Sequence, residues 1–121
     1  MAEAPRIRPE SATVLHVLRG YVRARPKAVF EAIAARLDPG PDAESYFTAD
    51  SAAWLVISQG GWWYRAEYRV VPDGNGSHVE HTLLNVAERA HRLGRFTGRK
   101  VIAGAPAAFT RLISELRAEL E

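Results

Sequence analysis

The sequence contains no cysteine, which excludes disulfide bonds, thiolate catalysis and cysteine-based zinc sites. It also has no apolar run near the roughly 20 residues that a membrane-spanning helix needs, so we expect no transmembrane segment. Its first residues lack the basic, apolar and small-residue regions of a secretory signal. Together these absences favour a cytoplasmic protein.

Motifs of several enzyme classes are missing as well. The sequence has no Gly-x-Ser-x-Gly nucleophile elbow and no phosphate-binding loop. Gly74-Asn75-Gly76 is too short for a dinucleotide fingerprint, and a hairpin turn explains it. No histidines stand at metal-ligand spacing with an acidic partner. We therefore predict no metal ion and no other cofactor.

The composition is that of an ordinary globular domain. The chain has 121 residues, of which 47% are hydrophobic and 25% are charged, so one domain with a single core is expected. The formal net charge is +2. Because the only lysines are Lys27 and Lys100, the sequence pI of 9.3 mostly reflects arginine.

Positive charge is concentrated in residues 89–100. This segment has no acid, and its cationic side chains are Arg89, Arg92, Arg95, Arg99 and Lys100. Such a segment can bind the phosphates of nucleic acid or of acidic lipids, or it can be a solvated loop. The net charge of the chain is small, and outside the predicted hairpin it has no exposed aromatic residues spaced to stack on bases. Both observations argue against a nucleic-acid partner.

The first part of the chain is predicted to be an arm followed by a strand. Residues 1–12, broken by Pro5 and Pro9, are expected to form a flexible N-terminal arm, and residues 13–121 to form the single domain. Residues 13–23 are rich in β-branched side chains and predict a strand, with Gly20 at a bend or bulge. Strict alternation would put Val14, His16, Leu18, Gly20 and Val22 on one face, and Leu15, Val17, Arg19, Tyr21 and Arg23 on the other.

A helix is expected to begin at Pro26, because a proline in the first helical turn costs no hydrogen bond. The segment 38–41 (DPGP) ends it, since a residue before proline avoids the α region. A short strand around Tyr46 and Phe47 is favoured over another helical turn, and a second strand is predicted over residues 53–58. The stripe of the helix that faces the core consists of Val29, Phe30, Ile33 and Leu37.

The strongest local prediction is a β-hairpin over residues 62–87. Its strands, 62–71 and 77–87, flank the turn sequence PDGNG, whose glycines and Asn75 are expected to supply positive φ angles. Setting Val70 opposite Val79 pairs Tyr68 with His81, Ala66 with Leu83, Tyr64 with Asn85 and Trp62 with Ala87 on an apolar, aromatic inner face. The outer face then pairs Arg69 with Glu80 and Glu67 with Thr82. A slip of one residue would mix the two faces.

A long amphipathic helix is predicted at the C-terminal end. Its strongest part is 106–120, and an earlier start near Gly98 would place Gly104 and Pro106 at a bend. The apolar stripe comprises Phe109, Leu112, Ile113, Leu116 and Leu120. The fold class expected from all these elements is α+β, with about five strands and a short helix after the first.

Two segments carry a family resemblance. The segments 22–30 (VRARPKAVF) and 109–116 (FTRLISEL) resemble the opening and closing elements of the START-like, or Bet v 1-like, superfamily, which includes the SRPBCC polyketide cyclase/dehydrase proteins. The resemblance implies a helix-grip fold, in which a curved antiparallel sheet grips the long C-terminal helix. Family members usually have seven strands and two short helices, so this chain looks like a shortened member.

The resemblance also implies a ligand. Family members bind a hydrophobic or amphipathic small molecule, lipid-like or aromatic as in a polyketide, between the sheet and the closing helix. The inward positions then either line a pocket or fill the core under the helix. The ligand-binding candidates are Trp54, Trp62, Tyr64, Tyr68, His81, Asn85 and Phe109.

An enzymatic alternative depends on two histidines. His16 and His81 are the catalytic candidates, because an inward histidine can act as general acid or base near neutral pH. In a cyclase or dehydrase, Tyr64 or Tyr68 would polarise a carbonyl. Both histidines can equally be neutral core residues hydrogen-bonded to a tyrosine or to the backbone.

A third alternative is a homodimeric interaction module without a ligand. A sheet of about five strands has open edges, which can pair with a second chain. The predicted register also puts Trp63 on the outer face beside Leu84 and Val86, where it forms an exposed contact or is covered by the arm. The sequence leaves these three functions open.

Overall fold

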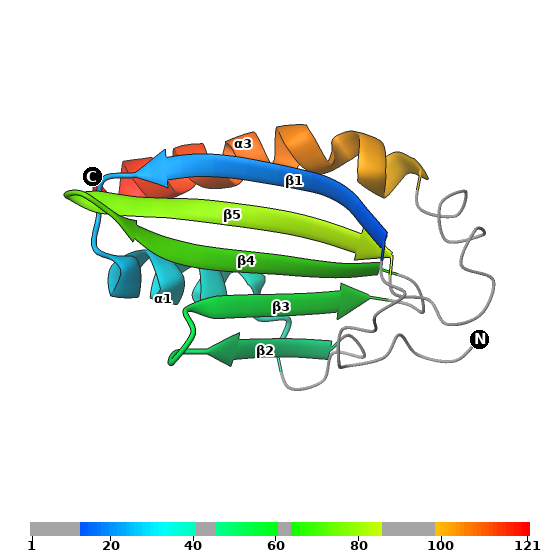
Figure 1. Cartoon of the computed structure of the whole chain (residues 1–121), viewed down its shortest axis with the longest axis horizontal. Helices are drawn as coiled ribbons and strands as arrows, with labels where there is room; N and C mark the ends of the chain where they lie inside the picture. The colour runs from blue at the N-terminus through cyan, green and yellow to red at the C-terminus, as the bar shows by residue number, and fades with distance from the viewer. Residues whose placement is uncertain (1–12, 41–45, 61–63, 86–98) are drawn as a thin grey trace.

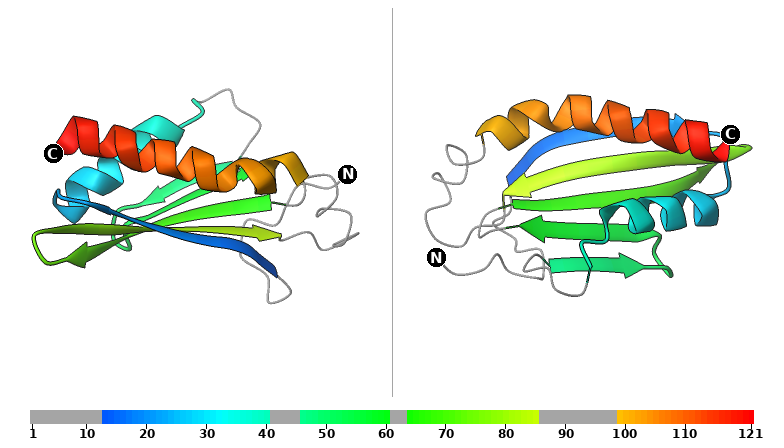
Figure 2. Two further views of the ribbon diagram at one scale, coloured as in Figure 1. Left: turned by 90° about the horizontal axis from the view of Figure 1, so that it is seen from above. Right: turned by 180° about the vertical axis from the view of Figure 1, so that it is seen from behind.

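The computed structural model describes residues 13–40, 46–60, 64–85 and 99–121. They form one antiparallel five-stranded sheet in the order β1-β5-β4-β3-β2, with both described helices on the same face (Figures 1 and 2). The elements are β1 (Thr13–Val22), α1 (Pro26–Leu37), β2 (Tyr46–Asp50), β3 (Leu55–Gly60), β4 (Tyr64–Asp73), β5 (Gly76–Asn85) and α3 (Arg99–Leu120). The predicted α+β class, five strands, early helix and C-terminal helix are confirmed; the predicted arm, 1–12, lies outside the described residues.

The hairpin of β4 and β5 has the predicted register. Val70 pairs with Val79 and Tyr68 with His81, while Arg69 faces Glu80 on the other side. The last predicted pair, Trp62 with Ala87, lies outside the described residues. Gly74 has a φ of +57°, so a two-residue turn with glycine in its first position joins the strands. The expectation that Asn75 and Gly76 also take a positive φ was wrong.

Strand β1 departs from the predicted alternation. The register with β5 shifts between Val14 and His16, because a bulge at Leu15 adds one residue to β1. As a result Val14 pairs with Leu84 on the outer face, and Leu15 packs with the inner cluster around Leu83. The predicted faces of Val14 and Leu15 were therefore wrong.

Gly20 has a packing role instead of the predicted bend or bulge. A Cβ atom at this position would lie 2.6 Å from Cγ1 of Ile113 on α3. Real Cβ atoms do not approach a carbon so closely, because packed interiors leave no room for overlap. Gly20 therefore lets α3 pack closely against β1.

Helix α1 follows the sequence prediction. Pro26 occupies the first helical turn, and Asp38 ends the helix by donating its backbone N–H to the carbonyl oxygen of Ala34 over 3.0 Å. The helix buries Val29, Phe30 and Ile33. Together with residues of the sheet and α3, they form the main core, whose buried members are Val22, Val29, Phe30, Ile33, Val56, Val70, Val79, Phe109, Ile113 and Leu116.

Helix α3 begins at Arg99, so the earlier of the two predicted starts is confirmed, and Pro106 lies inside it. Its buried stripe is Ala105, Phe109, Ile113 and Leu116, with Leu112 half-buried. Three of these four lie in the main core, and Ala105 belongs to a smaller cluster with Ala66 and Leu83. The part of α3 before Phe109 therefore approaches the sheet through small side chains.

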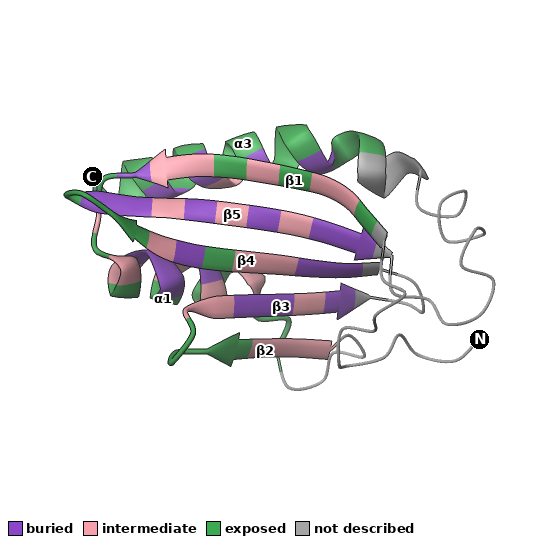
Figure 3. Cartoon of the chain, viewed as in Figure 1, coloured by how far each residue is buried: buried purple, intermediate pink, exposed green. Residues whose placement is uncertain are grey.

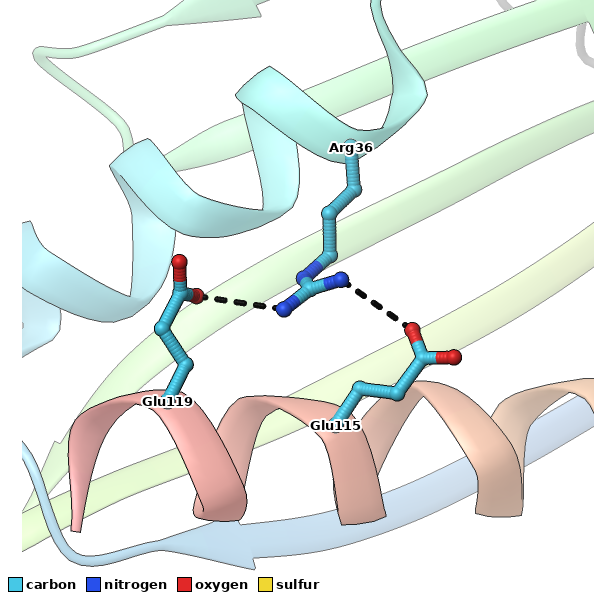
Figure 4. Close-up of polar contacts among 3 residues, drawn as sticks. All are labelled: Arg36, Glu115 and Glu119. Carbon is cyan, nitrogen blue, oxygen red and sulfur yellow. Dashed lines mark hydrogen bonds and ion pairs between the residues drawn. The ribbon is translucent and has the colours of Figure 1, made fainter.

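An ion-pair cluster joins the two helices (Figure 4). Arg36 of α1 contacts Glu115 over 3.1 Å and Glu119 over 3.3 Å, both on α3. All three side chains are a third to a half exposed, so water screens the attraction and each pair contributes about 0–1 kcal/mol. The apolar core below them therefore holds the helices to the sheet, and the cluster fixes their relative position.

Strands β3, β4 and β5 contain many buried positions (Figure 3), and two of them, Gln59 and Arg65, are polar residues that alternate with the inner-face residues. Nε of Arg65 lies 2.7 Å from a carboxylate oxygen of Glu67, and the two side chains are only 7% and 12% exposed. Arg65 also donates to the side-chain oxygen of the buried Gln59 over 3.2 Å. The alternation predicts that Glu67 points outward, but it does not predict that Glu67 and Arg65 are buried.

Candidate functional site

A pocket of about 510 Å³ lies between the inner face of the sheet and α3. It falls within the size range of about 300–1,000 Å³ that is usual for small-molecule sites. Strands β3, β4 and β5 supply its floor, α3 its roof, and the end of α1 one wall. The lining residues are Leu37, Ser58, Ala66, Tyr68, His81, Leu83, Gly104, Ala105, Ala108, Phe109 and Leu112.

The pocket exists because small residues face one another across the two layers. Ala66 lies on the floor, and the roof above is made of Gly104, Ala105 and Ala108. A Cβ added to Gly104 would meet no atom of the described residues within 4 Å, and both Gly104 and Ala108 are exposed. The pocket is therefore open at the roof, whereas the large side chains Phe109 and Ile113 close the layers farther along α3.

The polar lining is sparse and comes from neighbouring strands. Ser58 of β3 pairs with Ala66 of β4, and in the next row Tyr68 of β4 pairs with His81 of β5. Directly paired residues share a face of an antiparallel sheet, so these side chains project into one apolar space. A few polar groups in an apolar lining are typical of a site that orients a small molecule.

His81 is the most constrained of these polar residues. Its ring is stacked on Tyr68 with a centroid distance of 4.3 Å and on Phe109 at 5.6 Å, and both stacks are within 14° of parallel. The residue is only 5% exposed, and its Nδ1 atom has no hydrogen-bond partner among the residues that the structure describes. The imidazole is thus held by aromatic packing, and its Nδ1 atom is buried without a hydrogen-bond partner among the described residues.

Burial lowers the pKa of His81 below its ordinary value of 6.5, and the nearby charge of His16 lowers the pKa further. A hydrogen bond with the backbone of Glu67 acts in the opposite direction but does not reverse the shift. Charging the ring would place an ion among aromatic and aliphatic side chains, where water cannot solvate it. His81 is therefore a neutral imidazole at neutral pH.

This shift predicts a pH-dependent stability. Below pH 6.5 the unfolded chain takes up a proton at His81 more readily than the folded chain does, so the free energy of unfolding should fall as pH is lowered. The fall should level off below the pKa of the folded state. Urea denaturation between about pH 7 and pH 5 measures it, and the difference between wild type and His81→Phe isolates this histidine. An identical pH profile in both proteins would contradict the prediction.

The structure brings together three of the predicted ligand-binding residues, Tyr68, His81 and Phe109. Trp54 is not among them: it lies in the turn between β2 and β3 with a φ of +49°, and it packs on the main core. Its placement on an inward strand was wrong because β3 begins only at Leu55.

The other predicted residues lie at the end of the hairpin or beyond the pocket. Tyr64 and Asn85 pair across β4 and β5, but their side chains and all of Trp62 lie outside the described residues. His16 is half-buried on the inner face opposite Leu83, and it does not line the pocket. The lining residues that were not predicted as ligand-binding are mostly small or aliphatic. The sequence marks Ala66 and Leu83 as inward by alternation, and Leu37 and Leu112 as inward by helical spacing, but nothing in it marks any of them as lining a pocket.

Two other predictions concern partners. Among the residues that the structure describes, no three His, Asp or Glu side chains are grouped as ligands of a metal ion. None of the described helices is long and apolar enough to cross a bilayer. The basic segment, 89–100, lies outside the described residues except for the first two residues of α3, whose side chains are not described.

Two surfaces bear on the predicted homodimer: the outer-face patch of Trp63, Leu84 and Val86, and the edge strand β1. Leu84 is fully buried, which contradicts an exposed patch at this position and agrees with the alternative that the patch is covered. Trp63 and Val86 lie outside the described residues. On the edge strand β1, Val14 is 47% exposed and Val17 46%. A homodimer remains a prediction, which light scattering can test.

Comparisons with known proteins give little further guidance. No protein-family model and no curated protein matches the sequence. Among solved structures, the crystal structure of TTHA0849 from Thermus thermophilus is similar, with 14% identity and a TM-score of 0.47. The match covers 85% of this chain and 93% of that chain. We therefore interpret the pocket from its own residues.

Proposed function

We propose that the protein binds a hydrophobic or amphipathic small molecule, lipid-like or aromatic, in the pocket between the sheet and α3. The observation that carries this proposal is the pocket of about 510 Å³, whose lining is apolar except for a few polar side chains on adjacent strands. The resemblance of 22–30 and 109–116 to the START-like superfamily supports the same function and a helix-grip arrangement. In that arrangement the sheet and α3 are the two walls of the ligand site.

The energetics suit a modest affinity. Apolar surface removed from water contributes about 25 cal/mol per Å², but the loss of ligand freedom and the ordering of side chains oppose this gain. At about 0.5 kcal/mol per heavy atom, a probe of about ten heavy atoms binds with a Kd on the order of 0.1 mM. Tighter binding would require a ligand that fills the pocket and satisfies its polar groups.

Filling the pocket is expected to abolish binding without unfolding the protein. In Ala66→Phe the added ring enters the hollow under α3, so 2-naphthol should bind at least about tenfold more weakly than to wild type, as measured by calorimetry. The free energy of unfolding should fall by about 1–3 kcal/mol, because the ring enters the pocket but also presses on the side chains packed around Ala66, so the variant should remain folded. Ala107→Phe, at an exposed position of α3 outside the pocket, is the matched control and should bind normally. Equal binding by both variants would place the ligand elsewhere.

A second candidate function follows from the neutral ring of His81. A neutral imidazole nitrogen at a pocket can act as a general base, with Tyr68 polarising a carbonyl, as in a polyketide cyclase or dehydrase. This candidate requires turnover: a β-hydroxyketone should lose water in the presence of the protein, and the reaction should stop in His81→Phe. Binding of the ketone without any loss of water would favour the non-catalytic function.

A further inference from the structure

The inference concerns Nδ1 of His81, which is buried and has no hydrogen-bond partner within the described part of the chain. Native proteins leave few buried polar atoms unpaired, because each one loses its hydrogen bonds to water on folding without replacing them. His81 cannot turn easily toward another partner, since its ring is stacked on both Tyr68 and Phe109. His81 lines the pocket, so a ligand there is next to its ring. Because Nδ1 itself is buried, a partner from the pocket reaches it only when the surrounding side chains shift slightly.

The chemistry of the ring decides what kind of partner fits. The groups that face His81 from the elements around it are Tyr68 and the backbone of Glu67 on β4, His16 on β1 and Phe109 on α3. None of these is a carboxylate that would stabilise a charged ring, and burial keeps the imidazole neutral. A neutral imidazole has one N–H donor and one acceptor nitrogen. The backbone of Glu67 acts to raise the pKa, as expected when a ring N–H donates to a carbonyl oxygen. Since Nδ1 has no partner among the described residues, we assign this donor to Nε2, which makes Nδ1 the acceptor.

We propose that the ligand of this pocket is an apolar molecule with one hydroxyl group, an alcohol or a phenol, which donates a hydrogen bond to Nδ1 of His81. The inference rests on the proposed binding function and adds the chemical class of the ligand. A ketone or ether of the same shape offers only acceptors and leaves Nδ1 unpaired. A buried acceptor should therefore favour the hydroxyl ligand over the ketone or ether. The oxygen of a ketone or ether loses its hydration on binding and gains no hydrogen bond from Nδ1.

The test compares 2-naphthol with 2-methoxynaphthalene, which differ only in whether the oxygen carries a hydrogen or a methyl group. By calorimetry at neutral pH, wild type should bind 2-naphthol about tenfold more tightly. His81→Phe keeps an aromatic ring against Tyr68 and Phe109 but has no acceptor, so its preference should disappear. His78→Phe is the matched control, because His78 lies on the same strand outside the pocket, and this variant should keep the preference.

The outcomes separate the inference from the proposed function. If wild type binds both compounds equally, or if His81→Phe keeps the preference, the assignment of a hydroxyl ligand is overturned while the binding function stands. If neither compound binds to wild type and no larger alcohol of the series does, the proposed function itself fails. These results need no knowledge of the natural ligand.

A second measurement keeps the test decisive if His81→Phe does not fold. In wild type labelled with ¹⁵N at histidine, 2-naphthol should move the Nδ1 resonance of His81 in the direction of an accepted hydrogen bond, and 2-methoxynaphthalene should not. A bound 2-naphthol that leaves this resonance in place would show that its hydroxyl group does not contact His81.

Discussion

Replacement of Glu67 by alanine is expected to lower the free energy of unfolding by about 3–5 kcal/mol. The carboxylate of Glu67 contacts Nε of Arg65 at 2.7 Å, and both side chains are nearly buried on the outer face of the sheet. Removing the carboxylate takes away the negative charge at 2.7 Å from the guanidinium of Arg65, and the side-chain oxygen of Gln59, a neutral acceptor, does not replace that charge. A buried charge that loses its counter-charge is among the most destabilising changes a single substitution can make. Urea denaturation measures the loss directly.

Two further variants test whether the loss comes from the buried ion pair: a control at an exposed pair and a double variant without either charge. Glu80→Ala removes a carboxylate from the same face, but the Arg19–Glu80 pair is exposed and 3.9 Å apart, so the expected loss is below about 1 kcal/mol. The double variant Arg65→Met with Glu67→Leu removes both charges and should recover part of the stability, because apolar residues replace buried ion pairs well, while the buried oxygen of Gln59 loses its hydrogen bond from Arg65. Equal effects of Glu67→Ala and Glu80→Ala would mean that the Arg65–Glu67 pair is solvated in solution.

The second large effect is expected where α3 crosses β1. Ile113→Ala should cost about 2–4 kcal/mol, because Ile113 is buried in the main core and its loss leaves a cavity. Gly20→Ala should cost about 1–3 kcal/mol, since the new Cβ would lie 2.6 Å from Cγ1 of Ile113 and would push α3 away from the sheet. Both losses can be measured by thermal or urea unfolding.

The double variant distinguishes close packing from two independent defects. In Gly20→Ala with Ile113→Ala, the added methyl group enters the space that the isoleucine leaves, so the total loss should be smaller than the sum of the single losses. An additive result would show that Gly20 and Ile113 do not restrict each other. A second core variant, Val56→Ala, should remain additive with Gly20→Ala, because Val56 lies on β3, which β5 and β4 separate from β1.

The hairpin of β4 and β5 could be predicted to the residue because two kinds of information agree there. The turn around Gly74 fixes the loop length, and the alternation of apolar and charged residues fixes the faces. The helix after Pro26 and the stripe of α3 were predictable for the same reason, since a helical period and a proline or glycine signal coincide. All these signals are local in the sequence.

The errors arose where the deciding contacts are distant in the sequence. The bulge at Leu15 depends on how β1 meets β5, and nothing in β1 alone marks it. The positive φ of Trp54 accompanies its packing on the main core and its carbonyl bond to the N–H of Val70, so contacts outside the turn outweigh the local preference. Both are cases in which tertiary contacts override a regular pattern.

The candidate site was predictable only in its aromatic part. Tyr68, His81 and Phe109 are visible in the sequence as inward positions, but whether they surround a pocket depends on the side chains packed opposite them. The space exists because Ala66 on the sheet and Gly104, Ala105 and Ala108 on α3 line it with small side chains, and these residues come to one pocket only after the sheet and α3 are assembled. The sequence around Ala66 does not indicate that this alanine and Gly104 of α3 line the same pocket.

The strand order has a consequence for synthesis of the chain. Strands β2, β3, β4 and β5 pair with their neighbours in sequence, whereas β1 pairs with β5, from which it is separated by the rest of the sheet. β1 therefore leaves the ribosome early, but its hydrogen-bonding partner is made last of the strands. Closing such a long loop costs entropy before the pairing offsets it. During this delay the backbone of β1 and its apolar residues, including Val14, Val17 and Leu18, must be kept from pairing with other chains.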